Sequence, residues 1–561
     1  MTDLLERSEP VIALEKPQWR NWMPVGILLL AAMLAGLVGF TVFTIQSAWL
    51  ETHSQVPDPA SYSLRAAMLY ERIATEGRLA VAWHQLVRNS LNPMRVVPLV
   101  LFAPQALAHP LGQLCTVIPM LFAFVSLFGL TVYRRCGSFG YACACMIAGC
   151  AVPGFYNGTW GLGPFWLDLP AGLLIAAAAL ALLNSNELRD LRWVSLFAVL
   201  ISWAALSRYV AGVYAFCVCA PVLACYLWSR FRSGESWKTS LLPIGIIGAI
   251  VIGLAGYFVI GHYSAVSSLY AAYGFGNKGM WGSFLFTVTS VQTFMTTPYL
   301  VMLAVAAVLQ IAMGVRSWNE VRLLAIQWWL PVAVVAFLSI SCEVGEAKHG
   351  TLYAAPLLVI AALVPPGRPI RWESAVPPVA SIGIAACSIY LSFGVAHSTY
   401  MRGIRPAAAA KAQRDAELAV GKAIIDQGRG LAWMPYYDEN DEIVTLEAFH
   451  KYHVMIVRGS HRTRFSIHES YLTTDHPKQT PEEMAPAIYD FATADLDVAV
   501  VPANPASALA AANNPYSREL IQYFAAKLPA DSDWQRAFEV SDPRFGMLVG
   551  YRNRTRTGGR N

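Results

Sequence analysis

Charged residues are scarce in this chain: 14% of its 561 residues are Asp, Glu, Lys or Arg, whereas 56% are hydrophobic. An ordinary soluble domain carries roughly a quarter charged residues, so a single soluble globule is excluded. The scarcity is uneven, because residues 1–404 hold 23 Lys and Arg and 16 Asp and Glu, while residues 405–561 hold 18 and 20. The sequence therefore predicts a multi-span transmembrane domain over 1–404 and a soluble α/β domain over 405–561.

Cysteine is absent from residues 405–561, and all 10 cysteines precede residue 388, nearly all inside apolar runs. This distribution indicates packing residues and excludes a disulfide framework. Cys143 and Cys145 form a C-x-C without the polar ligands that a metal site needs. A P-loop is also absent, and the glycines 158, 161 and 163 lack the strand-turn-helix context of a nucleotide-binding fingerprint. No nucleic acid partner is expected, since the net positive charge belongs to the membrane part.

Long apolar runs fill residues 23–395. About eleven of them approach the roughly 20 residues that a helix needs to cross a bilayer, which predicts a polytopic α-helical membrane protein with about 11 transmembrane helices. The first run, Met23–Gln46, exceeds the apolar region of a signal peptide, which favours an uncleaved anchor. The last run is Val376–Val395.

Basic residues occupy every second connection between the runs. By the positive-inside rule these connections are cytoplasmic, and the N-terminal tail with Lys16 and Arg20 lies on the same side. An odd number of spans then places the C-terminal domain outside, as expected for an integral protein of the cytoplasmic (inner) membrane with an extracytoplasmic, periplasmic tail. The basic residues concerned are Arg134, Arg135, Arg189, Arg192, Arg230, Arg232, Lys238, Arg316, Arg322, Arg368 and Arg371.

Two outer connections are long. Residues 47–112 contain amphipathic segments such as Ala60–Glu76, in which Tyr62, Leu69 and Ile73 recur at helical spacing. We expect such helices to lie on the membrane surface. Residues 261–294 are rich in Gly, Ser and aromatic residues, which is typical of a loop over a lipid-facing cleft.

Ionisable groups at the membrane boundary are costly, so each one is a candidate functional residue. Asp58 follows the first span and would serve as a general base or a metal ligand; the alternative is that it caps a helix starting near Ala60. Asp168 opens the fourth span and is the only charged residue between Arg135 and Glu187. One interpretation is that the helix dipole stabilises the Asp168 carboxylate. The other is that this isolated carboxylate needs a partner, which would be either Asp58 together with a cation, or a substrate hydroxyl.

Cations accompany these acids on the outer side. Lys348 and His349 open a helix after Glu346, and such a start is a ready anion site, although Lys348 would also fit a snorkelling anchor. Arg208 stands between two spans with no room for a solvated loop, which indicates an anionic ligand or an ion pair within the protein. Arg65 and Arg95 are lesser candidates for phosphate contact, with contact to anionic lipid as the alternative.

Four motifs in this order resemble the GT-C superfamily of integral-membrane glycosyltransferases, in particular the branch with the protein O-mannosyltransferases and the aminoarabinose transferase of lipid A. Asp58-Pro-Ala-Ser-Tyr62 looks like the first outer loop of the family, and Trp166-Leu-Asp168-Leu-Pro170 looks like its second acidic position. Ala205-Leu-Ser-Arg208-Tyr209 is similar to a segment that usually reads Leu-Thr-Lys. Lys348-His349-Gly-Thr-Leu-Tyr353-Ala-Ala-Pro356 resembles its Lys-His-x-x-Tyr-x-x-Pro stretch.

The resemblance implies an enzyme that moves a sugar from a polyprenyl-phosphate donor to a cell-envelope glycan, lipid or protein acceptor on the outer face, with inversion. Asp58 would be the base and Asp168 its assistant, while Lys348, His349 and Arg208 would neutralise the departing phosphate. Tyr62, Glu346 and Tyr353 are further candidates. A divalent metal ion at Asp58 and Asp168 is a candidate cofactor, and membrane lipid is an expected partner.

Two other classes stay open. A transporter or flippase of a lipid-linked glycan would show inverted repeats and ionisable groups near mid-membrane, and the sequence shows neither. In a non-catalytic envelope assembly protein, the outward carboxylates would serve only as helix caps and as anchoring residues at the membrane boundary.

Overall fold

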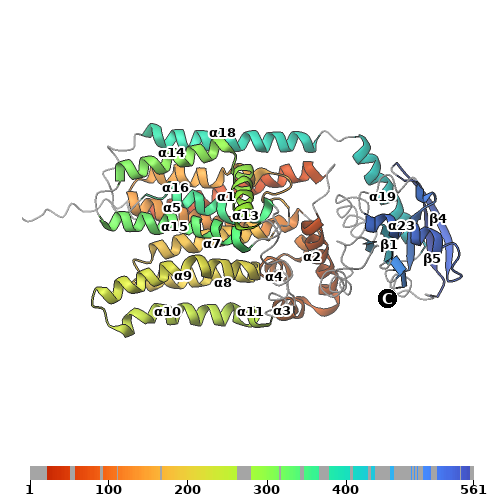
Figure 1. The fold of residues 1–561 in the computed structure, drawn as a ribbon, viewed down its shortest axis with the longest axis horizontal. Coiled ribbons are helices and arrows are strands. Elements are labelled where there is room, and N and C mark those ends of the chain that lie inside the picture. The colour runs from red at the N-terminus through yellow and green to blue at the C-terminus, as the bar shows by residue number, and fades with distance from the viewer. Residues whose placement is uncertain are drawn as a thin grey trace, which may run out of the picture.

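A helical bundle and a sheet make up the described part of the protein, a computed structural model (Figure 1). The described residues are 22–50, 57–88, 93–109, 111–164, 167–261, 279–314, 318–341, 347–365, 378–404, 408–427, 431–435, 455–459, 482, 485–486, 489–490, 497–506, 515–543 and 545–555.

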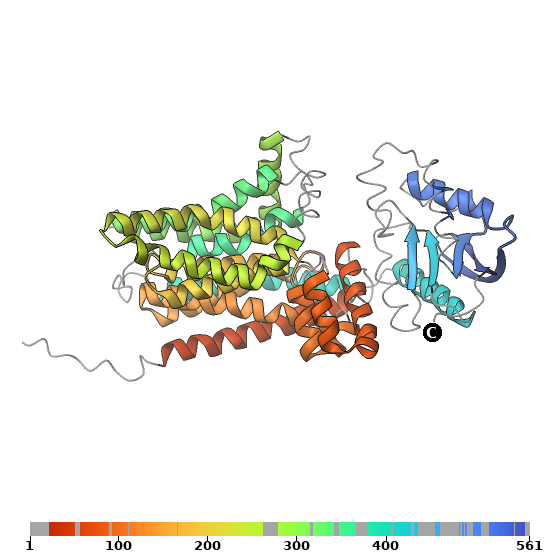
Figure 2. The same ribbon diagram turned by 90° about the horizontal axis from the view of Figure 1, so that it is seen from below.

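Long apolar helices run side by side in the bundle (Figures 1 and 2). Among the described residues, four stretches of helix are long and apolar enough to cross a bilayer, or five if the bent pair Thr287–Met295 and Thr297–Ile311 counts as one span, and there are shorter apolar helices of 10–17 residues. The chain is therefore a polytopic helical membrane protein. The bundle helices are α1 (Met23–Leu50), α5 (Ile118–Cys136), α6 (Phe139–Cys150), α7 (Asp168–Asn184), α8 (Leu191–Ser207), α9 (Tyr209–Arg232), α10 (Trp237–Val251), η5 (Ile252–Gly256), α11 (Tyr257–Gly261), α14 (Thr297–Gly314), α15 (Trp318–Ser341), α16 (Ala347–Leu363) and α18 (Pro378–Gly403).

Helix α7 is the centre of the bundle. Every residue from Asp168 to Asn184 is buried, and α7 packs against α5, α8, α9 and α16. Its sequence is almost entirely Leu and Ala, and the four consecutive alanines 176–179 present little bulk, so neighbouring helices approach closely. The position of Asp168 is thus fixed by the most enclosed helix of the bundle.

Helix α13 (Gly279–Met295) lies where the sequence predicts an outer loop over residues 261–294. The loop prediction is wrong for this segment, because α13 packs against α15 and α16. It meets α14 at an angle of 97°, and Figure 1 shows it lying across the other helices. Thr296, at the break, has a φ of 67°, which is strained for a β-branched residue.

The first long outer connection folds into a small helical layer at one end of the bundle (Figure 2). It contains α2 (Pro57–Glu76), α3 (Arg78–Arg88), α4 (Pro93–Phe102), η2 (Pro104–Ala108) and η3 (Gly112–Thr116). Helix α2 confirms the helix predicted over Ala60–Glu76. Its apolar stripe of Tyr62, Leu69 and Ile73 packs into a core with α3, α4 and η2.

An ionic cluster holds the opposite end of the bundle together. Glu187 accepts hydrogen bonds from Arg189 at 3.0 Å and from Ser229 at 2.9 Å, and it pairs with Arg322. Asn186, Glu187 and Leu188 all have positive φ values (49°, 56° and 68°), a turn that only the surrounding contacts can hold. Three connections with basic residues therefore meet at one end of the bundle, as the alternation of charge predicts.

Replacing Glu187 with glutamine is expected to destabilise the protein by about 1–2 kcal/mol, because the amide cannot hold the two guanidinium groups of this cluster. The side chain of Glu187 is 14% exposed, so solvent cannot replace those contacts fully. Thermal unfolding in detergent measures the effect. Glu539→Gln is the control, because it removes the partner of Arg536 in a pair that is largely solvent-exposed. It is expected to lower stability by under about 0.5 kcal/mol. Equal losses of stability in the two variants would contradict the prediction.

The last part of the chain holds a five-stranded sheet of order β2-β1-β3-β5-β4. Strands β1 and β2, and β1 and β3, are parallel, whereas β5 pairs antiparallel with β3 and β4. The apolar patterns of the sequence predict helices over 408–426 and 516–528 and strands over 454–457, 498–501 and 546–551, but neither β1 nor β4. The elements are α19 (Ala408–Asp426), β1 (Leu431–Pro435), β2 (Met455–Gly459), β3 (Val498–Pro502), α23 (Pro515–Lys527), β4 (Trp534–Asp542) and β5 (Gly546–Asn553).

Candidate active site

Asp168 and Arg208 form an ion pair inside the bundle. Nη1 of Arg208 donates to Oδ1 of Asp168. The carboxylate of Asp168 is fully buried, whereas the Arg208 side chain is 23% exposed. A buried carboxylate is tolerated only with such a partner, so the ion-pair alternative for Arg208 is confirmed, and the partner that Asp168 requires is this arginine.

The local backbone explains why both groups reach the same place. Asp168 is the first residue of α7, where the helix dipole favours a carboxylate. Arg208 is the single residue between α8 and α9, with an extended backbone (φ −159°, ψ 121°). This break turns the chain between two packed helices without a loop. The side chain of Arg208 is thereby directed at the start of α7.

The predicted site on α16 lies at the same end of the bundle as this ion pair. Arg134 and Arg135 end α5; Arg134 bonds Asn184 in the last turn of α7 at 3.4 Å, and Arg135 bonds the carbonyl of Pro365 just after α16 at 3.3 Å. Helices α7 and α16 thus both end near the end of α5, and since they also pack against each other, they run in the same direction. Their N-termini share the opposite end.

Lys348 and His349 lie in the first turn of α16, which begins at Ala347, and Tyr353 is in the second. The sequence therefore predicts correctly that the two cations open a helix. Anions gain from the unpaired N–H groups and the dipole at such a terminus. Glu346 lies outside the described residues.

Asp58 and Arg65 belong to α2, which starts at Pro57. Asp58 is therefore inside the first helical turn, not the cap of a helix beginning near Ala60. Tyr62 packs on the core of the outer layer. Gln46, near the end of α1, contacts the loop before α7, since a Cβ at Gly163 would lie 2.5 Å from its Oε1. The segment that carries Asp58 thus leaves α1 at the end where Asp168 lies.

Arg95 is fully buried in α4. Its Nε and Nη2 donate to Oγ1 of Thr116 in η3 at 3.1 and 3.0 Å. Burial lowers the pKa of Arg95 to about 9, which means that the charged form is held at an electrostatic cost that an anion nearby would relieve. Helix α4 packs against α8, the helix that ends at Arg208.

The metal prediction at Asp58 and Asp168 remains untested, and the ion pair does not favour it. Among the described residues, no group of three or more His, Cys, Asp or Glu side chains could hold a metal ion. A cation at Asp168 would compete with the guanidinium of Arg208 for the same carboxylate.

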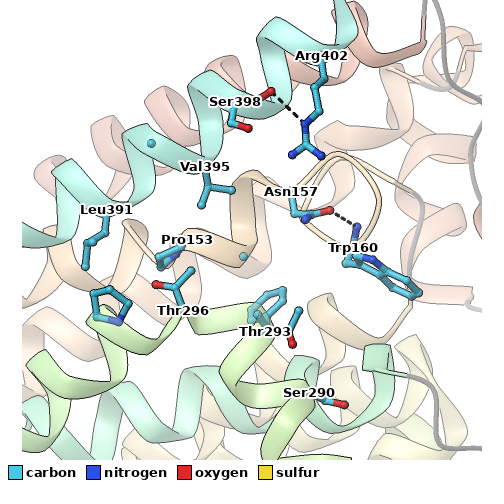
Figure 3. A pocket seen from close by; sticks show the side chains of 14 residues that line it. Pro153, Asn157, Trp160, Ser290, Thr293, Thr296, Leu391, Val395, Ser398 and Arg402 are labelled. Carbon is cyan, nitrogen blue, oxygen red and sulfur yellow. Dashed lines mark hydrogen bonds between the residues drawn. The ribbon is translucent and has the colours of Figure 1, made fainter.

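A cavity that the sequence does not reveal lies between η4 (Pro153–Tyr156), the α13–α14 break and α18 (Figure 3). Its volume is about 470 Å³, and Arg402 and Trp160 lie at one edge. The prediction ends the last span at Val395, so Arg402 falls outside it. Residues compatible with a helix continue beyond Val395 up to Gly403, where α18 ends. This continuation is the sequence signal that could have placed Arg402 on the last helix.

Comparison with known proteins finds a likeness in structure but not in sequence. No family model and no curated protein sequence matches the chain. The crystal structure of ArnT from Cupriavidus metallidurans bound to undecaprenyl phosphate matches with a TM-score of 0.56. The match covers 94% of this chain and 98% of that chain, at 12% identity. The chain therefore has the GT-C fold, which confirms the fold that the resemblance implies.

Proposed function

We propose that this protein is a glycosyltransferase that moves a sugar from a polyprenyl-phosphate-linked donor to an acceptor on the outer face of the membrane. The observation that carries the proposal is the buried Asp168–Arg208 pair on a GT-C fold, at the same end of the bundle as the helix starts with Asp58 and Lys348. ArnT, which has this fold, binds undecaprenyl phosphate.

The reaction forms a bond between an acceptor oxygen and the anomeric carbon, and it breaks the bond from that carbon to the phosphate oxygen. In the proposal Asp58 takes the acceptor proton, and attack from the face opposite the phosphate inverts the anomeric centre. The leaving phosphate gains negative charge, which Arg208, Lys348 and His349 stabilise. Asp168 orients the guanidinium of Arg208, because their ion pair fixes one edge of the fork.

The Asp168–Arg208 pair fixes the position of the guanidinium that is proposed to meet the phosphate. Nη1 of Arg208 is engaged by Asp168, and the Arg208 side chain is 23% exposed, so a phosphate can approach it from the exposed side. The planar fork of arginine can bind a carboxylate and a phosphate together, which the single ammonium of lysine does less well. Arg65 and Arg95 are further candidates for contact with the lipid phosphate. The sugar is taken from a lipid carrier, and the acceptor is an envelope glycan, lipid or protein.

Asp58→Asn is expected to lower transfer from a lipid-linked sugar by about 10²–10⁴-fold, the usual contribution of a general base. Glu71→Gln changes an exposed carboxylate on the same helix and is expected to leave transfer unchanged. Turnover is measured on purified, folded protein. Full turnover in Asp58→Asn would contradict the assignment of Asp58 as the base. Unchanged affinity for the donor in both Lys348→Ala and Arg208→Ala would contradict the proposed phosphate site.

The same assay decides between this proposal and its rivals. A flippase would move the lipid-linked glycan across vesicles without forming a new glycosidic bond. An envelope assembly protein would show neither activity. In the described part of the chain, the central helix α7 carries its one ionisable residue at its first position, whereas a transporter typically places such groups near mid-membrane.

A further inference from the structure

The cavity beside α18 is separate from the Asp168–Arg208 ion pair, and packed helices define its shape. Helices α14 and α18 are in contact close to the cavity, where Oγ of Ser388 lies 3.4 Å from Sδ of Met302. The chain turns by 97° between α13 and α14, and residues on both sides of this turn line the cavity. The result is a wedge of about 470 Å³ between α18, η4 and the α13–α14 break, a size suited to a small ligand or part of a larger one.

The wedge adjoins the surface that faces lipid. Just below it, α14 exposes Val301 and Val305, and α18 exposes Ile389 and Phe393, each by more than half. In a membrane protein such rows of large apolar side chains contact acyl chains. A ligand in the wedge would therefore extend its apolar part along these two helices.

Polar groups gather at the far end of the wedge. Figure 3 shows the guanidinium of Arg402 pointing from α18 toward Asn157, with Trp160 beside them. Nε of Arg402 bonds the carbonyl of Ser398 at 3.2 Å, and the guanidinium lies over the ring of Trp49. Oδ1 of Asn157 accepts from the backbone N–H groups of residues 159 and 160 at 2.8 and 3.0 Å. The amide therefore offers donors, and this end of the wedge favours an anion.

The break between α13 and α14 contributes a hydroxyl to the wall of the wedge. Thr296 lines the cavity, and its Oγ1 is buried without a hydrogen-bond partner among the described residues. A buried hydroxyl without a hydrogen-bond partner lowers the stability of the fold. A positive φ at the same residue adds strain. A ligand oxygen in the wedge would relieve the first cost.

We propose that this wedge binds an anionic phospholipid of the surrounding bilayer, with its phosphate at Arg402 and Asn157 and its acyl chains along α14 and α18. The lipid would fill the space under the α13–α14 break and support the end of the bundle that carries Asp168. The proposal concerns binding and is independent of sugar transfer.

Gly394→Phe tests the site by filling it. Gly394 lines the cavity, and a Cβ there meets nothing within 4 Å, so the added ring enters the wedge without a clash at its root. Gly383→Phe is the matched control, since Gly383 lies three turns earlier on the same helix with equally open space. Purified full-length protein is titrated with short-chain phosphatidylglycerol, and native mass spectrometry counts the lipids retained. Gly394→Phe is expected to weaken binding at least about tenfold, and Gly383→Phe to leave it unchanged.

Arg402→Gln tests the charge, and the choice of ligand tests the source of the anion. The variant is expected to lose the preference for phosphatidylglycerol over phosphatidylcholine, by about three- to tenfold, while binding of phosphatidylcholine is unchanged. Glycerol 3-phosphate at millimolar concentration is expected not to compete. Equal losses in Gly394→Phe and Gly383→Phe, an unchanged lipid preference in Arg402→Gln, or full competition by glycerol 3-phosphate would each overturn the proposal.

Discussion

Arg208→Gln is expected to lower sugar transfer by about 10²–10³-fold, because it removes a positive charge from the leaving phosphate. It is also expected to lower stability by about 3–5 kcal/mol, since Asp168 is fully buried and would be left as a carboxylate without its counter-charge. Activity and stability therefore fall together in this variant. Transfer assays and thermal unfolding measure the two effects.

The double variant Asp168→Asn/Arg208→Gln separates the two roles. Asparagine keeps the shape of Asp168, and neither substituted side chain carries a charge, so no carboxylate is left buried without its counter-charge and most of the lost stability is expected to return. Transfer is expected to stay low, because the positive charge is still missing. Recovery of transfer along with stability would show that the pair is structural and that Arg208 does not act on phosphate.

Arg208→Lys provides a second measure of geometry. It keeps the charge but replaces the planar fork with a single ammonium group, so one group must serve both Asp168 and the phosphate. We expect partial transfer, between that of the parent and that of Arg208→Gln. Arg192→Ala, which removes an exposed arginine in the first turn of α8, at the opposite end of the helix from Arg208, is the matched control and is expected to retain full transfer.

The sequence identifies the individual members of the candidate site better than their pairing. Scarcity of charge makes Asp168 and Arg208 conspicuous, because an ionisable residue in an apolar run needs a reason to be there. Their contact, however, joins positions 40 apart in the chain, and it depends on how α7 and α8 pack. Periodicity within one helix carries no information about that packing.

Helix α13 and strand β4 show what local patterns miss. Residues 279–295 are rich in Gly, Ser and Thr, which disfavour helix relative to Ala and Leu, yet the segment is helical because it packs against α15 and α16. Strand β4 alternates poorly, with several exposed polar residues, and its pairing with β5 defines it. In both elements tertiary contacts override local propensity.

The glycines before α7 have a structural explanation that their spacing alone does not give. A Cβ on Gly161 would lie 2.4 Å from the carbonyl oxygen of Phe155 and 2.5 Å from that of Asn157. These are backbone atoms of the same tight loop and cannot move aside. At Gly163 the nearest atom is the far end of the Gln46 side chain, which can move. Glycine at 161 therefore permits a close approach of backbone, which explains the residue without a phosphate-binding loop.

Gly161→Ala is expected to destabilise the protein by about 2–3 kcal/mol, because the added methyl group must displace backbone in a packed loop. Since this loop leads directly into Asp168, transfer is expected to fall as well. Gly140→Ala is the matched control: its Cβ meets nothing within 4 Å in the helix α6, where alanine is more favourable than glycine by about 0.5–1 kcal/mol. The two substitutions should thus shift the unfolding temperature in opposite directions. A rise for Gly161→Ala would mean that the loop adapts easily and does not fix the start of α7.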